Sequence, residues 1–167
     1  ARDKAGTADS LLNLAETLAA RGDYPGALTH DREGYLLYNE LGHRRGLRTA
    51  IARIGWIHIL RGEYPEAVGY LDKSIAVARE IRDEVGLAES LNLRGHLDRL
   101  TGRYKEALAG HAQALEIARR IGSPRLEIAA LDHQGATRAA LGEFPQALKL
   151  HEEARDLAAD IGDRKEW

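Results

Sequence analysis

Histidine is the residue type in this sequence best suited to chemistry, because a neutral imidazole both binds metals and transfers protons. The chain has seven histidines, of which His111 and His151 lie forty residues apart and His30 lies one residue off that spacing. Equivalent positions on packed helices are ~10 Å apart, too far to share a Zn²⁺ ion at ~2.1 Å. No two histidines are four residues apart with a glutamate between them. We therefore predict no metal site and no cofactor.

Nucleophiles and phosphate-binding loops are the next candidates for chemistry. The chain has few serines, no Gly-x-Ser-x-Gly sequence and no glycine-rich phosphate loop. The acidic pair Glu152–Glu153 is typical of a solvated helix face, as is the neighbouring His151. Catalysis needs a constellation of positioned groups, and none is visible here. The sequence predicts that this chain is not an enzyme.

Charge and composition exclude other classes. The formal net charge is −2, and basic patches interleaved with aromatic residues are absent, so we expect no nucleic-acid partner. No apolar run reaches the ~20 residues needed to cross a bilayer, and no signal-peptide pattern opens the chain. Cysteine and methionine are both absent. We expect a cytoplasmic location, no membrane partner, and an origin as a fragment of a larger protein.

One phrase occurs four times at a constant spacing, which indicates a stacked repeat. It reads RGDYPGALTH at Arg21–His30, RGEYPEAVGY at Arg61–Tyr70, TGRYKEALAG at Thr101–Gly110 and LGEFPQALKL at Leu141–Leu150. Apolar residues recur at spacings of three and four on both sides of the phrase, which is the helical period.

Glycine and proline mark the ends of the predicted helices. Gly22 and its equivalents suit a positive φ at a helix end. Pro25 and its equivalents suit the first turn of the next helix. Gly42, Gly122 and Gly162 mark the second turn of each repeat. The predicted helices cover residues 6–20, 24–41, 45–60, 64–81, 84–100, 104–121, 124–140 and 144–161.

The repeated pattern Gly-x-Tyr-x-x-Ala, with another glycine seven residues upstream, resembles the tetratricopeptide repeat (TPR). The residues that carry it are Gly55, Gly62, Tyr64, Ala67, Gly95, Gly102, Tyr104, Ala107, Gly135, Gly142, Phe144 and Ala147, with Ala15, Gly22, Tyr24 and Ala27 in the first repeat. The repeat of forty residues is similar to the long subtype in bacterial signalling ATPases, bacterial transcription regulators, kinesin light chains and spindle-orientation adaptors.

The resemblance implies an all-α fold, a right-handed superhelical stack of four helix-turn-helix repeats with eight helices and a truncated ninth. Residues 1–167 then form one domain with repeats at 4–41, 44–81, 84–121 and 124–161, and residues 163–167 begin a further helix. In such a stack the first helix of each repeat lines the concave side.

The concave groove is the expected binding surface for a protein or peptide. The candidate residues are Asp9, Glu16, Thr49, Trp56, Glu89, Asn92, His96, Arg99 and Asp132. An exposed Trp56 beside the polar cluster on the third repeat fits a peptide anchor, although packing of Trp56 on a second helix explains it equally well. Only Asn92 and Arg99 suit carboxylate capture. The four acidic groove residues favour a basic or mixed peptide.

A polar seam between repeats is the second set of candidates. Positions that are usually apolar in the family hold His58, Arg94, Asp98, Gln134 and Arg138. Arg94 and Asp98 are four residues apart on one helix face, and Asp98 is expected to lie between His58 and Arg138 in the stack. We expect these groups to satisfy one another, and the alternative is a pH-sensitive or ligand-sensing seam at His58.

The sequence thus predicts a scaffold module that binds a protein or peptide, as a regulatory or adaptor part of a larger bacterial signalling protein. Two alternatives stay open. One is self-association into a homo-oligomer through exposed repeat ends, because repeat arrays need polar caps to remain monomeric. The other is a sensor domain for a small molecule or a pheromone-like peptide.

Overall fold

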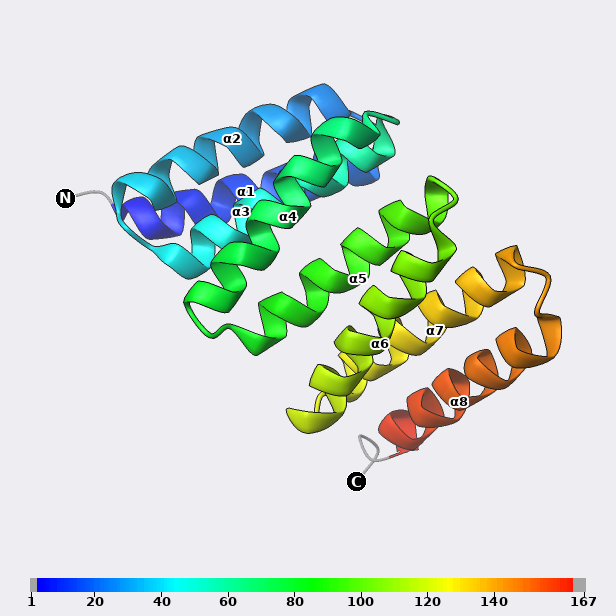
Figure 1. Cartoon of the computed structure of the whole chain (residues 1–167). Coiled ribbons are helices and arrows are strands. Elements are labelled where there is room, and N and C mark those ends of the chain that lie inside the picture. Colours follow the sequence, from blue (N-terminus) through cyan, green and yellow to red (C-terminus); the bar gives the residue numbers. More distant parts are fainter. Residues whose placement is uncertain (1–2, 164–167) are drawn as a thin grey trace. The chain divides into compact units, whose positions relative to one another are not determined.

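The chain folds into eight helices in a computed structural model that describes residues 3–163. No strand occurs within that range, so the all-α prediction of four helix pairs is confirmed (Figure 1). The helices are α1 (Lys4–Ala20), α2 (Tyr24–Glu40), α3 (Arg44–Leu60), α4 (Tyr64–Glu80), α5 (Glu84–Leu100), α6 (Tyr104–Arg120), α7 (Pro124–Ala140) and α8 (Phe144–Asp163).

Two compact units divide the chain, namely residues 1–86, called here the N-terminal unit, and residues 87–167, the C-terminal unit. In the N-terminal unit α1 packs on α2, α2 on α3 and α3 on α4, and α1 also touches α3. In the C-terminal unit α6 packs on α7 and α7 on α8. Within each unit these contacts are mainly between helices adjacent in sequence, as expected for a repeat.

Each of the helices α1 to α7 ends in a short turn with one residue in the left-handed region. Glycine occupies this position in six turns, for example Gly22 at φ 83° and Gly122 at φ 63°. In the turn between α4 and α5 the same position holds Arg82, with φ 54°. A side chain in this conformation costs roughly 1–2 kcal/mol, because Cβ approaches the following carbonyl oxygen.

Replacing Arg82 with glycine is therefore expected to raise the free energy of unfolding by about 0.5–1 kcal/mol, the relieved strain less the entropy that glycine adds to the unfolded chain. Urea unfolding measures the change. The matched control is Gly122→Arg at the equivalent turn, where we expect a loss of similar size. Equal stability of Arg82→Gly and wild type would contradict the strain.

Helix starts show a second repeated device. The side chains of Asp3, Asp23, His43 and Asp83 each accept a hydrogen bond from the backbone N–H of the glycine three residues later, at 2.9–3.1 Å. These contacts satisfy amides that the first helical turn leaves unpaired. A Cβ on Gly26 would lie 2.4 Å from the Asp23 carboxylate, so any other residue there would require that carboxylate to shift.

The core consists of small and branched aliphatic side chains. In the N-terminal unit Ala8, Leu12, Tyr38, Leu47 and Ile51 belong to one buried cluster, and a second cluster of Ala15, Ala27, Leu28, Ile54 and Ile57 lies beside it. Burial of these apolar faces, which a single helix pair cannot achieve, drives the stacking.

The end of α8 differs from the sequence prediction. The turn expected at Gly162 is not formed, because α8 continues through that residue to Asp163. The further helix expected over residues 163–167 lies outside the described residues, apart from Asp163, which is the last residue of α8.

Candidate functional site

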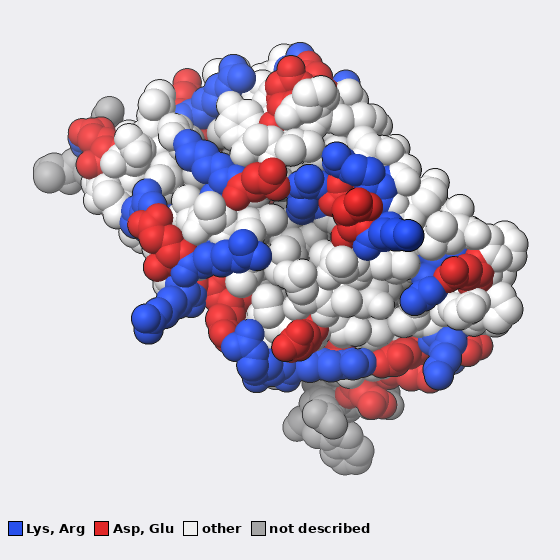
Figure 2. Space-filling view, viewed as in Figure 1, with Lys and Arg blue, Asp and Glu red and all other residues white. Residues whose placement is uncertain are grey.

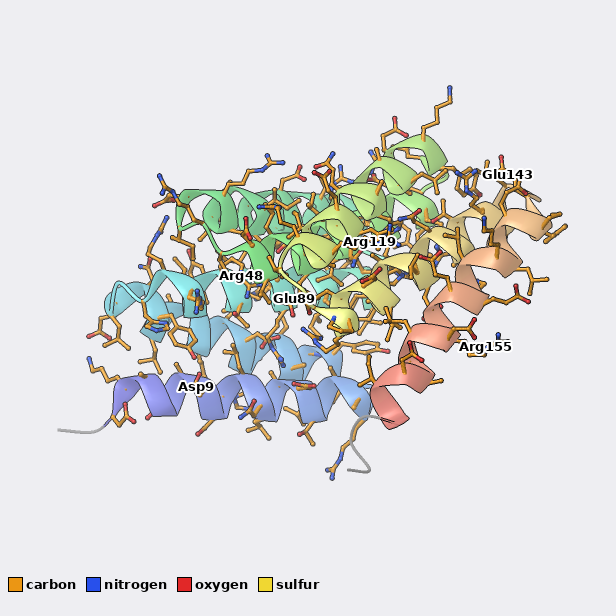
Figure 3. All side chains as sticks on the ribbon, turned by 90° about the horizontal axis from the view of Figure 1, so that it is seen from below. Asp9, Arg48, Glu89, Arg119, Glu143 and Arg155 are labelled. Carbon is orange, nitrogen blue, oxygen red and sulfur yellow. The ribbon has the colours of Figure 1, made fainter. Side chains whose placement is uncertain are left out.

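The predicted groove residues lie on α1 and α3 in the N-terminal unit and on α5 and α7 in the C-terminal unit. Their four carboxylates each have a partner within the same unit. Asp9 accepts a hydrogen bond from the Tyr38 hydroxyl, and Arg53 lies 3.1 Å from Glu16. Arg125 lies 2.6 Å from Glu89, which is labelled in Figure 3, and His151 lies 3.0 Å from Asp132. The basis for expecting a basic partner is therefore weaker than the sequence indicated, because no carboxylate is left unengaged.

The N-terminal unit brings two of these residues, Asp9 and Thr49, to one pocket of about 290 Å³. The pocket is lined by Asp9, Leu12, Asn13, Tyr38, His43, Arg45, Gly46, Thr49 and Arg53. Burial, and then the bond to Asp9, raise the pKa of Tyr38 to about 12, so its hydroxyl stays protonated. Glu16 and Trp56 do not line this pocket.

Trp56 is half-buried, and it packs against the cluster of Ala15, Ala27, Leu28, Ile54 and Ile57. Part of its ring therefore serves the core, as the packing interpretation predicts. The rest of the ring is partly exposed, so packing in the core does not prevent Trp56 from also contacting a ligand.

Arg53 is a groove-side residue that sequence reasoning missed. Its Nε donates to the fully buried carboxylate of Asp31 at 2.8 Å, and its guanidinium also reaches Glu16 and the carbonyl oxygen of Leu12. Burial raises the pKa of Asp31, and the bond and charge of Arg53 oppose that rise. The sequence does contain a signal for this contact, because the opposite charges of Asp31 and Arg53 lie twenty-two residues apart.

The C-terminal unit brings three predicted groove residues, Asn92, His96 and Arg99, together on α5. Arg99 Nη2 lies 3.2 Å from His96 Nδ1, and Asn92 Oδ1 lies 3.1 Å from Nδ1 of His111 on α6. From α7 the His133 ring contacts both imidazoles, with ring centroids 5.2 Å from His111 and 5.7 Å from His96. We call Asn92, His96, Arg99, His111 and His133 the histidine cluster.

Two members of this cluster, His111 and His133, were not predicted as site residues. His111 is 0% exposed, and it lies over Gly95, where an added Cβ would be 2.6 Å from the imidazole. His111 and His133 are again twenty-two residues apart, the spacing of Asp31 and Arg53. This spacing joins the second helix of one repeat to the first helix of the next.

The imidazoles of the histidine cluster are neutral at pH 7. Burial and then the charge of Arg99 lower the pKa of His96 to about 4. Burial and then His133 lower the pKa of His111 to about 3, and burial and Arg99 lower the pKa of His133. No group of three or more His, Asp and Glu side chains within the described range is placed to hold a metal ion.

Acid is therefore expected to destabilise this unit. The pKa of His111 in the folded chain, about 3, lies below the ordinary histidine value of 6.5, so the unfolded chain binds the proton more tightly. Stability is lost as the pH falls below 6.5, by on the order of 2 kcal/mol at pH 5 for His111 alone. Urea unfolding at pH 7, 6 and 5 measures the loss.

The control for this prediction is His111→Leu, which carries the residue type of the equivalent Leu71. Leucine cannot bind a proton, so its unfolding free energy should change less between pH 7 and pH 5. An identical pH profile for His111→Leu and wild type would contradict the role of His111.

The predicted polar seam has different partners from those expected. His58 contacts Glu63 at 2.6 Å, Asp98 contacts Arg103 at 2.7 Å, and Arg138 pairs with Glu143. Each contact joins a first helix to a residue five positions later, at the turn of the same repeat. Arg94 pairs with Asp98 as its spacing predicted, whereas Gln134 Nε2 is buried without a hydrogen bond among the described residues.

Asp98 and Arg138 each pair with the turn of their own repeat, which supplies a nearer partner than the seam does. The signal was present in the sequence. The residues at 58, 98 and 138 are complementary in charge to those at 63, 103 and 143, and the sign is reversed in the third repeat.

Opposite charges also alternate over the surface. On the face shown in Figure 2, basic and acidic side chains are interspersed and no large region of one sign is present. Arg119 of α6 links Glu127 at 2.7 Å and Glu153 of α8 at 2.6 Å, and both contacts are exposed (Figure 3). Within residues 3–163 no helix is long and apolar enough to span a membrane.

Four helix pairs, glycine-marked turns and a forty-residue period define a helical-repeat protein. The family model described as tetratricopeptide repeat matches residues 6–80 and 86–160, and the chain therefore belongs to this family. No curated protein sequence matches the chain.

Solved structures with the same fold are distant in sequence. A Rap protein complexed with competence and sporulation factor has a TM-score of 0.89 and 17% identity, covering 98% of this chain and 46% of that protein. Aspartyl phosphate phosphatase F from Bacillus subtilis has a TM-score of 0.86 and 15% identity, covering 98% and 43%. A putative kinesin light chain from Podosopora anserina has a TM-score of 0.70 and 17% identity, covering 93% and 76%. This chain thus spans less than half of the first two proteins.

Proposed function

We propose that this chain is a scaffold that binds a protein or peptide through the first helices of its repeats, and that it does not act as an enzyme. The observation that carries the proposal is the histidine cluster, where polar side chains without full hydrogen bonding gather on α5. Buried polar groups are normally paired. Asn92 is 4% exposed and its Nδ2 has no partner among the described residues.

Further support comes from the family and from the pocket of the N-terminal unit. Tetratricopeptide arrays present extended surfaces, and the structurally similar Rap protein is complexed with competence and sporulation factor. The Asp9–Thr49 pocket offers amide, hydroxyl and guanidinium groups beside Leu12 and Tyr38. Such a mixture suits a peptide with both polar and apolar side chains.

The test begins with selection of binding peptides from a random phage-displayed library. Dissociation constants of the selected peptides are then measured by calorimetry against wild type, Trp56→Ala and Asn92→Ala. We expect each groove variant to weaken binding by about tenfold, the loss of one anchor or one buried hydrogen bond. The matched controls are Gln113→Ala and Lys105→Ala on the exposed face of α6, which should bind as wild type does.

Circular dichroism shows whether all variants are equally helical. Loss of binding in the α6 variants with full binding by the groove variants would move the site to the second helices. That result would overturn the proposed surface.

We also infer a regulatory or adaptor role within a larger bacterial signalling protein, as the family resemblance implies. This chain spans less than half of the Rap protein and less than half of the phosphatase, which supports the inference of a larger protein. Sequencing the gene on both sides of this segment tests the inference, and an attached signalling domain is the expected result.

Self-association through α8 is the second candidate function. Phe144 is 67% exposed and Leu148 is 60% exposed, whereas Leu28, equivalent to Leu148 in the first repeat, is 5% exposed. Leu148 is thus accessible on α8 at a position that the first repeat buries. Multi-angle light scattering over a range of concentrations tests this function. A dimer that Leu148→Lys dissociates would support it, and a monomer at all concentrations would exclude it.

A further inference from the structure

Arg99 differs from six other arginines of the C-terminal unit because no carboxylate among the described residues pairs with it. Its guanidinium lies 3.2 Å from His96 Nδ1, and its Nε is buried without a hydrogen-bond partner among the described residues. Ion pairs with carboxylates are made by Arg94, Arg103, Arg119, Arg125, Arg138 and Arg155. A half-buried guanidinium without a counter-ion is costly, so an anion there would be bound favourably.

The groups around Arg99 are suited to an anionic oxygen. Asn92 Nδ2 is an unpartnered donor on a side chain that is almost fully buried. His111 Nδ1 donates to Asn92 Oδ1, so the buried Nε2 of His111, which has no partner among the described residues, becomes a donor only when the ring takes up a proton. Carboxylates close to the cluster are already engaged, with Asp132 on His151 and Glu89 on Arg125. The cluster therefore has a cation and unused nitrogens, and its own unit supplies no free carboxylate to it.

Charged and titratable groups face the cluster from several helices of this unit. They are His96 and Arg99 on α5, His111 on α6, His133 and Asp132 on α7, and His151 of α8, which holds Asp132. Among these groups only Asp132 raises the pKa of a cluster histidine, namely that of His133. Arg99 lowers the pKa of His133 by more than Asp132 raises it. The balance in the free protein is positive at Arg99 and neutral at the imidazoles.

We propose that Arg99 and the histidines around it bind a side-chain carboxylate of an acidic peptide segment, and that an imidazole takes up a proton when the carboxylate binds. The proposal rests on the peptide-binding function above and names the chemistry of the partner. It differs from simple charge pairing because the site changes its own protonation.

The linkage follows from the charges. The positive charge of Arg99 is the second cause, after burial, of the lowered pKa of His96 and of His133. A bound carboxylate opposes that charge, so the pKa of these imidazoles rises from its value in the free protein, which is about 4 for His96. A group whose pKa rises on binding favours the complex as the pH falls through the raised pKa. The carboxylate is therefore bound more tightly in mild acid than at pH 7.5.

The test uses the whole chain and a capped hexa-aspartate peptide, which stays ionised at pH 5.5 because aspartate has a pKa near ~3.9. Calorimetry gives the dissociation constant at pH 7.5 and pH 5.5, and buffers of different ionisation enthalpy give the number of protons taken up. We expect binding to tighten about twofold or more at pH 5.5, with net proton uptake. Capped hexa-asparagine should not bind measurably.

The decisive variant is Arg99→Gln, which removes the charge without breaking any ion pair among the described residues. It should weaken hexa-aspartate binding about tenfold or more and abolish the proton uptake. The matched control is Lys149→Gln on the exposed face of α8, which removes one positive charge from the same unit and should leave both quantities unchanged. Equal losses in both variants would mean that binding depends only on the net charge of the protein, and this result would overturn the proposed site.

A second measurement tests the effect of the Arg99 charge on the histidines in the folded protein without any ligand. Proton NMR titration of the imidazole Cε1–H signals in the free protein should give a higher pKa for His96 in Arg99→Gln than in wild type. An unchanged pKa would show that the charge does not act on the histidines, and the proton linkage would fail.

Inorganic phosphate distinguishes the source of the anion. Weak phosphate binding beside tighter hexa-aspartate binding supports a peptide carboxylate, and phosphate binding without hexa-aspartate binding would overturn it. Failure of hexa-aspartate alone leaves the scaffold function intact, because peptides selected from the random library report on that function independently.

Discussion

Replacing Arg53 with alanine is expected to lower the free energy of unfolding by about 3–5 kcal/mol at pH 7, the usual cost of leaving a buried carboxylate without its partner. Asp31 is fully buried, and Arg53 Nε is its hydrogen-bond donor at 2.8 Å. The change also removes the donor to the Leu12 carbonyl oxygen and the contact with Glu16. Urea unfolding with circular dichroism measures the loss.

The pH dependence of this loss gives a second, independent check. Arg53 is the main influence that opposes the raised pKa of Asp31, so the pKa of Asp31 in Arg53→Ala should be higher still. A carboxyl whose folded pKa is raised destabilises the protein as the pH rises through that pKa. The cost of Arg53→Ala should therefore shrink on going from pH 7 towards pH 4.5.

The control is a double variant, Asp31→Leu with Arg53→Leu, which copies the leucines at the equivalent positions of the next repeat, Leu71 and Leu93. An apolar pair of similar volume often replaces a buried ion pair at little cost. We expect the double variant to be more stable than Arg53→Ala by about 2 kcal/mol or more. A cost below about 1 kcal/mol for Arg53→Ala would show that Asp31 is satisfied without the guanidinium.

The second large effect is expected for Gly95→Ala, which should destabilise the C-terminal unit by about 1–3 kcal/mol through overpacking. The added Cβ would lie 2.6 Å from Cε1 and 2.9 Å from both ring nitrogens of His111. That imidazole is held by Asn92 and by the His133 ring, so it cannot move aside freely. The overpacking must exceed the gain of about 1 kcal/mol that alanine brings to a helix interior.

Gly69→Ala is the matched control, because an added Cβ on that α4 residue meets nothing within 4 Å. It should stabilise the protein by about 0.5–1 kcal/mol. A further variant, Gly95→Ala with His111→Ala, removes the ring that causes the clash, and its cost should be less than the sum of the single costs. Stabilisation by Gly95→Ala, as at Gly69, would contradict the close contact.

Much of the fold could be predicted from local patterns. Glycine at the left-handed turn and proline in the first helical turn are direct consequences of backbone sterics, so all eight helices begin and end within two residues of their predicted bounds. Two local exceptions escaped this reasoning. Arg82 occupies a glycine position, and α8 continues past Gly162.

The candidate site was predictable only in part. Helical spacing placed Asn92, His96 and Arg99 on one face, and the structure brings these three together. It did not indicate that His111 and His133 would join them, because their contact depends on how closely α6 and α7 approach α5. It also suggested an acidic groove, but Arg53 neutralises Glu16 and Arg125 neutralises Glu89, while Asp9 and Asp132 are hydrogen-bonded within their own units.

The sequence by itself determined the helices, their turns and the register of the repeat, because these depend on φ preferences and on the 3.6-residue period. The tertiary structure decided which of the possible polar partners meet. Asp31 meets Arg53, His111 meets His133, and Asp98 meets Arg103 rather than Arg138. Long side chains have several rotamers on any helix face, and only the packing of neighbouring helices selects one partner among those within reach.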